Sequence, residues 1–277
     1  MGELFGYPFF RHALIGLVLI SVASALIGTY IVTRRLVSIS GGVTHACFGG
    51  LGLGYFLGIS PILTAALFAV ASSLGVEWMS SRGKVREDSA IAVIWAIGMA
   101  IGILFVFLTP GYVPELNSFL FGNVLTISRA DLWAFAVYIV VLVLFFAVFY
   151  HKIIAVAFDR DFAKVMHLPV KFISISMTVL TAVCIVLTIR LVGIMLLMSM
   201  LALPQLIAEF FCRRFAGMMI LSAVISLLCC VGGLFFASFI DVPCSAFIVL
   251  LMAFVYIFVA FAFYIRQHII LHRIRRK

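Results

Sequence analysis

Nine apolar segments, each close to the length of a membrane-spanning helix, constrain this chain more than any other feature. A helical span needs about 20 mainly apolar residues to cross a bilayer. The segments lie at residues 13–32, 43–60, 61–79, 89–109, 131–150, 171–189, 191–210, 215–238 and 244–265. Only 10% of the residues are charged, whereas a soluble domain has roughly a quarter. The sequence therefore predicts an all-α, polytopic transmembrane helical bundle of about nine spans.

The segment at 43–60 is the least regular of the nine, because its glycines lower helix propensity. If this segment is re-entrant, the number of spans falls to eight, and we take eight to ten as the range. No connection between spans is long enough to fold into a catalytic domain. Residues 1–277 are therefore expected to form a single transmembrane domain.

The basic residues predict how the bundle is oriented. With the N-terminus outside and nine crossings, 16 of the 19 Lys and Arg residues fall in cytoplasmic segments, and the other three are Arg11, Arg129 and Arg190. Basic residues accumulate on the cytoplasmic side of membrane proteins. The expected topology is N-out and C-in. The basic tail at 266–277 then anchors to anionic headgroups, and nucleic acid is not expected as a partner.

The longest inner connection, residues 151–170, has the composition of a short helix between two spans. Asp159 to Met166 have fair helix propensity, and Pro169 stops the helix before the next span. Such a loop is either a solvated connection or a docking surface, and composition leaves both open.

His45 is the one ionisable side chain in the glycine-rich segment 43–60. An ionisable group in an apolar span usually faces a partner, a cavity or a transported solute. Gly41 and Gly49, one turn away on either side, supply no ligand, and Cys47 points about 200° round the helix. Zinc takes about four ligands, so His45 either binds a metal with help from elsewhere or hydrogen-bonds a neighbouring helix.

No enzyme signature is present in the sequence. The run from Arg82 to Val85, RGKV, lacks the upstream glycine and the following Ser or Thr of a phosphate-binding loop. The spans contain no paired catalytic carboxylates and no nucleophile–base pair. Met195, Met198 and Met200 are more typical of helix packing than of a copper site. We therefore expect no enzyme activity and no resident cofactor, with ATP bound only by partner subunits if it drives the protein.

Six blocks, in order over nearly the whole chain, resemble the zinc/manganese permeases of ABC importers. The blocks are RRLVSISGGVTHACFGGLGLGYFLGISP (from Arg34), DSAIAVIWAIGMAIGILF (from Asp88), ELNSFLFGNVLTIS (from Glu115), FDRDFAKVMHLPV (from Phe158), LVGIMLLMSMLALPQ (from Leu191) and FIDVPCSAFIVL (from Phe239). The resemblance implies a multi-pass permease subunit in a bacterial inner (plasma) membrane. It also implies a homodimer, two ABC ATPase subunits on the cytoplasmic side and an extracytoplasmic metal-binding solute-binding protein. The substrate would be a divalent ion, zinc or manganese, with iron a further candidate.

The resemblance also assigns roles to particular residues, in an alternating-access cycle. His45 matches the pathway histidine, and four glycines would let helices approach closely and move near the path: Gly49, Gly50, Gly52 and Gly54. The ATPase-coupling residues would be Phe158, Asp159, Asp161, Ala163, His167, Leu168 and Pro169. Glu115, Asp131 and Asp241 would either dock the binding protein or simply be solvated.

The chain departs from the family pattern next to His45. The family aspartate, one turn earlier on the same helix face, is Gly41 here. The loss of a hard anionic ligand leaves the ion and the full ligand set open. It keeps a second function in view, a permease for a metal chelate such as a siderophore, haem or cobalamin. An ion-coupled secondary transporter, working without an ATPase, is a third alternative.

Overall fold

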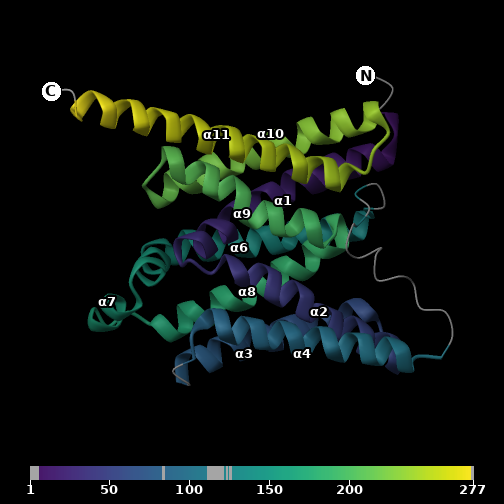
Figure 1. Ribbon diagram of the computed structural model, residues 1–277. Coiled ribbons are helices and arrows are strands. Elements are labelled where there is room, and N and C mark those ends of the chain that lie inside the picture. The colour runs from purple at the N-terminus through teal and green to yellow at the C-terminus, as the bar shows by residue number, and fades with distance from the viewer. Residues whose placement is uncertain (1–5, 83–84, 111–121, 123, 125–126, 276–277) are drawn as a thin grey trace.

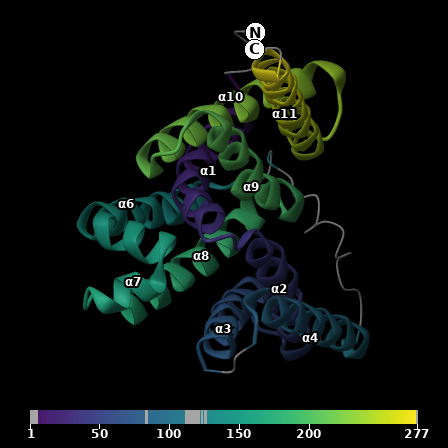
Figure 2. The same ribbon diagram turned by 60° about the vertical axis from the view of Figure 1, so that its left-hand side comes forward.

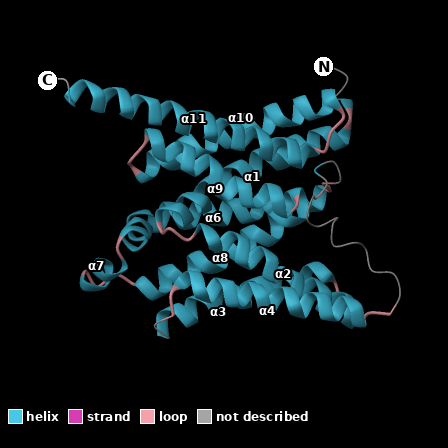
Figure 3. Ribbon diagram, viewed as in Figure 1, coloured by secondary structure: helices cyan, strands magenta, loops and turns pink. Residues whose placement is uncertain are grey.

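The computed structural model describes residues 6–82, 85–110, 122, 124 and 127–275, with the backbone alone at residues 81–82 and 269–275. Within these residues the regular structure is helical and no strand occurs (Figure 3). The helices are α1 (Pro8–Thr33), α2 (Val37–Leu57), α3 (Pro61–Arg82), α4 (Glu87–Leu108), α6 (Arg129–Phe158), α7 (Arg160–Val165), α8 (Val170–Val192), α9 (Ile194–Phe211), α10 (Phe215–Ile240) and α11 (Cys244–Arg275).

Nine of these helices correspond to the nine apolar segments. Eight are long and apolar enough to span a membrane by length and composition alone. The ninth, α2, is less apolar but has 21 residues, which gives a length of about 30 Å. Three-residue turns join α2 to α1 and to α3, and whether α2 spans the membrane or re-enters it stays open. The predicted polytopic helical bundle is confirmed, and its eight candidate spans among the described residues lie within the expected range of eight to ten.

The helices begin and end where local chemistry favours it. Pro8 begins α1, at a position where its missing N–H costs nothing. Ser128 caps α6 in a capping box with Asp131. Gly58 ends α2 with φ of +66°, a left-handed conformation that glycine adopts without steric cost.

The helices are arranged in two groups that α8 connects. α2, α3 and α4 pack closely on one another, while α9, α10 and α11 pack together with α1 (Figure 2). α8 contacts both groups, and α6 lies against α1 and α8. The N-terminal end of α1 lies at one end of the bundle, whereas α7 and the C-terminal end of α11 lie at the other (Figure 1). We refer to the latter as the α7 end.

Burial differs strongly between the helices. In the most apolar stretch of each helix, the share of residues that are buried is 72% in α1 and 61% in α8. The same share is 17% in α4 and 11% in α11. The first two helices therefore form the core of the bundle. The apolar outer faces of α4 and α11 suit contact with lipid or with another membrane subunit.

Candidate functional site

The glycines of α2 lie against the two neighbouring helices. A Cβ atom at Gly49 would meet the carbonyl oxygen of Gly98 in α4 at 2.9 Å, and Gly52 faces the backbone of Gly102 in the same helix. On the other side of α2, a Cβ at Gly50 would meet the carbonyl oxygen of Thr64 at 2.5 Å. Gly54 faces Thr64 and Pro61, also in α3. All four glycines thus allow close helix packing, and their role in lining or gating a path stays a prediction.

His45 lies on α2 where this helix meets α4. Its ring stacks on Trp95 with centroids 4.7 Å apart and planes 5° apart, and Phe48 lies on it at 6.1 Å. Its Nδ1 atom is buried and has no hydrogen-bond partner among the described residues. Among the described residues, Nδ1 therefore makes no hydrogen bond to a neighbouring helix, and the imidazole ring stacks on aromatic groups.

A methyl group occupies the space that a side chain at position 41 would need. A Cβ atom built at Gly41 would meet the terminal methyl of Met198, from α9, at 3.0 Å. This methyl fills the space one turn away from His45. No group of three or more His, Cys, Asp or Glu side chains that could hold a metal ion occurs in the described part of the chain. The described residues of one copy therefore contribute a single imidazole here.

The predicted short helix in the 151–170 loop is α7, and its sequence explains its boundaries. The Asp159 side chain accepts hydrogen bonds from the backbone N–H groups of Asp161 and Phe162, at 3.0 and 2.9 Å. At the other end His167 is left-handed, with φ of +53°, and the Leu168 N–H donates to the Ala163 carbonyl. Pro169 then precedes the first residue of α8. These caps hold a six-residue helix that is too short to be stable alone.

The two sides of α7 differ in chemistry. Ala163 is fully buried against the bundle. Large apolar side chains on α7 and at its two ends are exposed instead, by between 57% and 75%: Phe158, the last residue of α6, then Phe162 and Val165, and Met166 just after α7. We call these four residues the outer face of α7. On the same helix, the hydrogen bond from Lys164 and its charge lower the pKa of Asp161.

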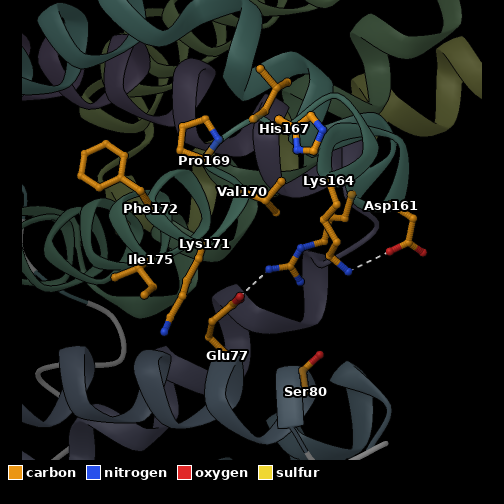
Figure 4. Close-up of a pocket in the computed structure, with 12 residues that line it drawn as sticks. Glu77, Ser80, Asp161, Lys164, His167, Pro169, Val170, Lys171, Phe172 and Ile175 are labelled. Atoms are coloured by element: carbon orange, nitrogen blue, oxygen red, sulfur yellow. Dashed lines mark hydrogen bonds and ion pairs between the residues drawn. The ribbon is translucent and has the colours of Figure 1, made fainter.

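Four charged residues that the sequence did not bring together meet at the α7 end. Arg34, Glu77, Glu87 and Arg160 come from the end of α1 and from α3, α4 and α7, and form three ion pairs. We call them the four-charge cluster. Two of its members, Glu77 and Arg160, line a hollow of about 1070 Å³ between α3 and the α7–α8 region (Figure 4). The one signal in the sequence is that Glu77 and Arg160 lie close to long apolar runs.

The three outer acidic residues have different surroundings. Asp131 accepts from the Ser128 backbone in the capping box and pairs with Arg190 at 2.8 Å, so its carboxylate already has partners. Asp241 ends α10 with φ of +58° and lines a hollow of about 330 Å³. Glu115 lies outside the described residues. Docking of a binding protein at these positions stays a prediction.

The sequence matches the ABC 3 transport family over residues 6–263. The chain belongs to this family. The family match covers all nine long helices, although α11 continues beyond it. The chain is therefore a multi-pass protein of the bacterial inner membrane, and ATP binding in such a transport system belongs to separate subunits.

Similar proteins agree with this assignment. The chain is 36% identical over 238 residues to a Chlamydia pneumoniae protein named "Probable metal transport system membrane protein", covering 84% of this chain and 81% of that protein. It is 26% identical over 269 residues to a manganese transport system membrane protein of Listeria monocytogenes, covering 97% and 95%. Its fold resembles a chain in the structure of PsaBC from Streptococcus pneumoniae in complex with Fab, with a TM-score of 0.80, 23% identity, and 93% and 94% coverage.

Proposed function

We propose that the chain is the membrane permease subunit of an ATP-driven importer whose substrate is a divalent transition-metal ion. The observation that carries the proposal is the family match over nearly the whole chain, with relatives named for metal or manganese transport. Zinc and manganese are the first candidates and iron is a further one. The permease has no hydrolytic role of its own.

The outer face of α7 supports docking of an ATPase subunit. Four large apolar side chains on a short helix and at its two ends are exposed at one end of the bundle. Such patches mark protein–protein contacts. ATP binding would then displace α7 and drive the bundle between outward and inward openings. Two copies of the permease, each with one ATPase, complete the proposed complex.

His45 supports the position of the ion path. Its Nδ1 is buried without a hydrogen-bond partner among the described residues, and its ring stacks on Trp95 and Phe48. One imidazole is a poor metal site, but a two-fold axis near α2 would bring two copies together. Weak and incomplete coordination suits transport, because the ion must leave as well as bind.

A metal-chelate permease is the second candidate, and a specific observation favours it. Gly41 and the Met198 methyl make the surroundings of His45 less anionic than a bare divalent ion requires. A chelate brings its own ligands, so its passage would need apolar space more than carboxylates. Uptake of a bare ion would depend on His45, whereas uptake of a chelate would not.

Uptake by the reconstituted complex tests the proposal. With the ATPase subunits and binding protein present, radiolabelled Zn²⁺ or Mn²⁺ should enter proteoliposomes only when ATP is supplied. His45→Ala should reduce uptake at least tenfold, because even outer-shell partners of metal ligands are worth about 10–100-fold in affinity. His151→Ala, which removes an imidazole from α6, is the matched control and should leave uptake unchanged. ATP-driven uptake of a chelate that survives His45→Ala would establish the second candidate instead.

Restoring the carboxylate tests the meaning of Gly41. In Gly41→Asp the Met198 methyl must move by a few tenths of an ångström, which a flexible side chain allows. Carboxylates suit manganese, so the added carboxylate should raise the ratio of Mn²⁺ to Zn²⁺ uptake severalfold. Gly41→Asn, similar in size but uncharged, should give a smaller rise. An unchanged ratio would show that residue 41 does not contribute to the ion path.

Substitution on the outer face of α7 tests ATPase docking. Val165 is 75% exposed, so Val165→Arg should leave the permease folded while it abolishes stimulation of the ATPase. Val165→Ala keeps the surface small and uncharged and should retain most of the stimulation. Full stimulation by Val165→Arg would place the contact elsewhere. Ala163 does not suit this test, because its burial means that substitution by arginine would disrupt packing.

A further inference from the structure

The four-charge cluster joins α7 to the helices that surround His45. Arg160, the first residue of α7, donates from Nη1 to Glu87 Oε1 at 3.2 Å and from Nη2 to Glu77 Oε1. Arg34 donates from Nη2 to the same Glu87 oxygen at 3.0 Å. The cluster thus connects four separate elements at the α7 end through two carboxylates.

Hydroxyl groups complete the cluster. The Ser174 hydroxyl in α8 accepts from Arg160 Nη2 at 2.6 Å and donates to Glu77 at 2.9 Å. The Ser80 hydroxyl donates to Glu87 at 3.2 Å, and Arg34 also donates to the Tyr30 hydroxyl at 3.1 Å. Two cations and two anions balance, so the loss of one charge leaves the others uncompensated.

The cluster is protected from water but still able to separate. The side-chain exposures are 6% for Arg34, 15% for Glu77 and 26% for both Glu87 and Arg160. Arg160 and Glu77 line the hollow between α3 and the α7–α8 region (Figure 4). Water in this hollow would solvate the ions if α7 moved away. A link of this kind is strong enough to transmit a displacement and weak enough to be reversible.

Through Glu87, the four-charge cluster connects α7 to the helix that contacts His45. Glu87 begins α4, and Trp95 follows it by eight residues, or about 12 Å along the helix. Trp95 stacks on His45. A displacement of α7 that pulls on Glu87 therefore acts on the helix that holds the His45 ring. α7 packs little against the rest of the bundle, since Ala163 is its buried residue and the residues of its outer face are exposed.

We propose that Arg160 is the positioning residue that transmits displacement of α7 to α3 and α4, and through α4 to the His45 region. This inference rests on the proposed function, because it requires an ATPase that moves α7. It assigns separate roles to the two sides of the helix. The outer face binds the ATPase, and Arg160 on the inner side passes the movement on to the transport helices.

The ratio of transported ion to hydrolysed ATP tests the inference in the reconstituted complex. In Arg160→Gln the outer face of α7 is intact, so ATP hydrolysis should continue while Zn²⁺ or Mn²⁺ uptake per ATP falls on the order of tenfold, within the usual range of coupling between sites. Arg160→Lys keeps the charge and should recover part of the ratio. The matched control is Arg86→Gln, beside Glu87, because among the described residues Arg86 pairs with Asp88 alone, on the surface of α4.

A double-mutant cycle separates transmission from general loss of stability. If Arg160 acts through Glu87, the double variant Arg160→Gln/Glu87→Gln should lower the ratio no further than the worse single variant. Additive losses, or a wild-type ratio in Arg160→Gln, would overturn the inference. If Arg160→Gln does not assemble, Arg160→Lys decides: a wild-type ratio refutes transmission through the paired guanidinium, and a reduced ratio supports it. Failure of the wild-type complex to transport either ion would refute the proposed function separately.

Discussion

α2, α3 and α4 are held together in two different ways along their length. In the middle of the bundle, glycines of α2 touch the backbones of both neighbours, and no charge is involved. At the α7 end, α3 and α4 are joined through Glu77, Glu87 and Arg160. Backbone contact is short-ranged and tolerates no added atom, whereas ion pairs are directional and can form and break. We infer from this difference that α2, α3 and α4 form a rigid unit in the membrane. The ion pairs at its α7 end form a reversible connection through which it can be moved.

The largest expected effect comes from filling the glycine contact. A Cβ atom in Gly52→Ala would meet Gly102 Cα at 2.9 Å and lie even closer to its carbonyl oxygen. Backbone atoms cannot rotate away, so the cost should reach the upper end of the usual overpacking range of about 1–3 kcal/mol. The temperature of thermal unfolding in detergent should fall by several degrees.

Gly232→Ala is the matched control for this contact. Gly232 lies inside α10, and a Cβ atom there would have nothing within 4 Å. Alanine should then stabilise the helix by up to about 1 kcal/mol. Equal unfolding temperatures for the two variants would show that α2 is not tightly packed against α4.

The next effect comes from removing a shared carboxylate. Glu87→Gln leaves Arg34 and Arg160 without the charge that both contact, and Arg34 is only 6% exposed. The stability loss should be about 2 kcal/mol, since hydrogen bonds to charged groups contribute about 1.5–3 kcal/mol. Asp88→Asn, the next residue along, breaks only an exposed pair with Arg86 and should cost about 0–1 kcal/mol. Comparison of the two unfolding temperatures measures how much more stability comes from a carboxylate that two arginines share than from one in a single exposed ion pair.

The smallest effect is expected at the opposite end of the bundle. Asp131 pairs with Arg190 and completes a capping box, and within the described part of the chain these contacts join two helices, α6 and α8. Asp131→Asn should cost about 1 kcal/mol, as for a lost cap. Arg190→Gln keeps the cap and removes the pair, so it should cost less. Losses at Asp131 as large as those at Glu87 would show that charge alone matters, and not its connection to several helices.

The sequence anticipated the elements better than the contacts. The nine apolar segments coincide with nine long helices, and the predicted helix at Asp159–Met166 is found as α7. Both follow from local patterns of hydropathy, capping and proline position. At the candidate site, the sequence singled out His45 and noted the absence of a carboxylate at Gly41. It gave no means of predicting that Trp95 stacks on His45 or that Met198 occupies the space beside Gly41, because these residues come from other helices.

Membrane spans, the α7 loop and the family pattern were therefore determined by the sequence itself, since burying an apolar run of about 20 residues depends on that run alone. Only the tertiary structure decided which polar groups meet. Arg160 and Glu77 are separated by 83 positions, and no local pattern specifies which face of α3 turns toward α7. Helix packing sets that choice, because buried charges are tolerated only where packing brings opposite charges together.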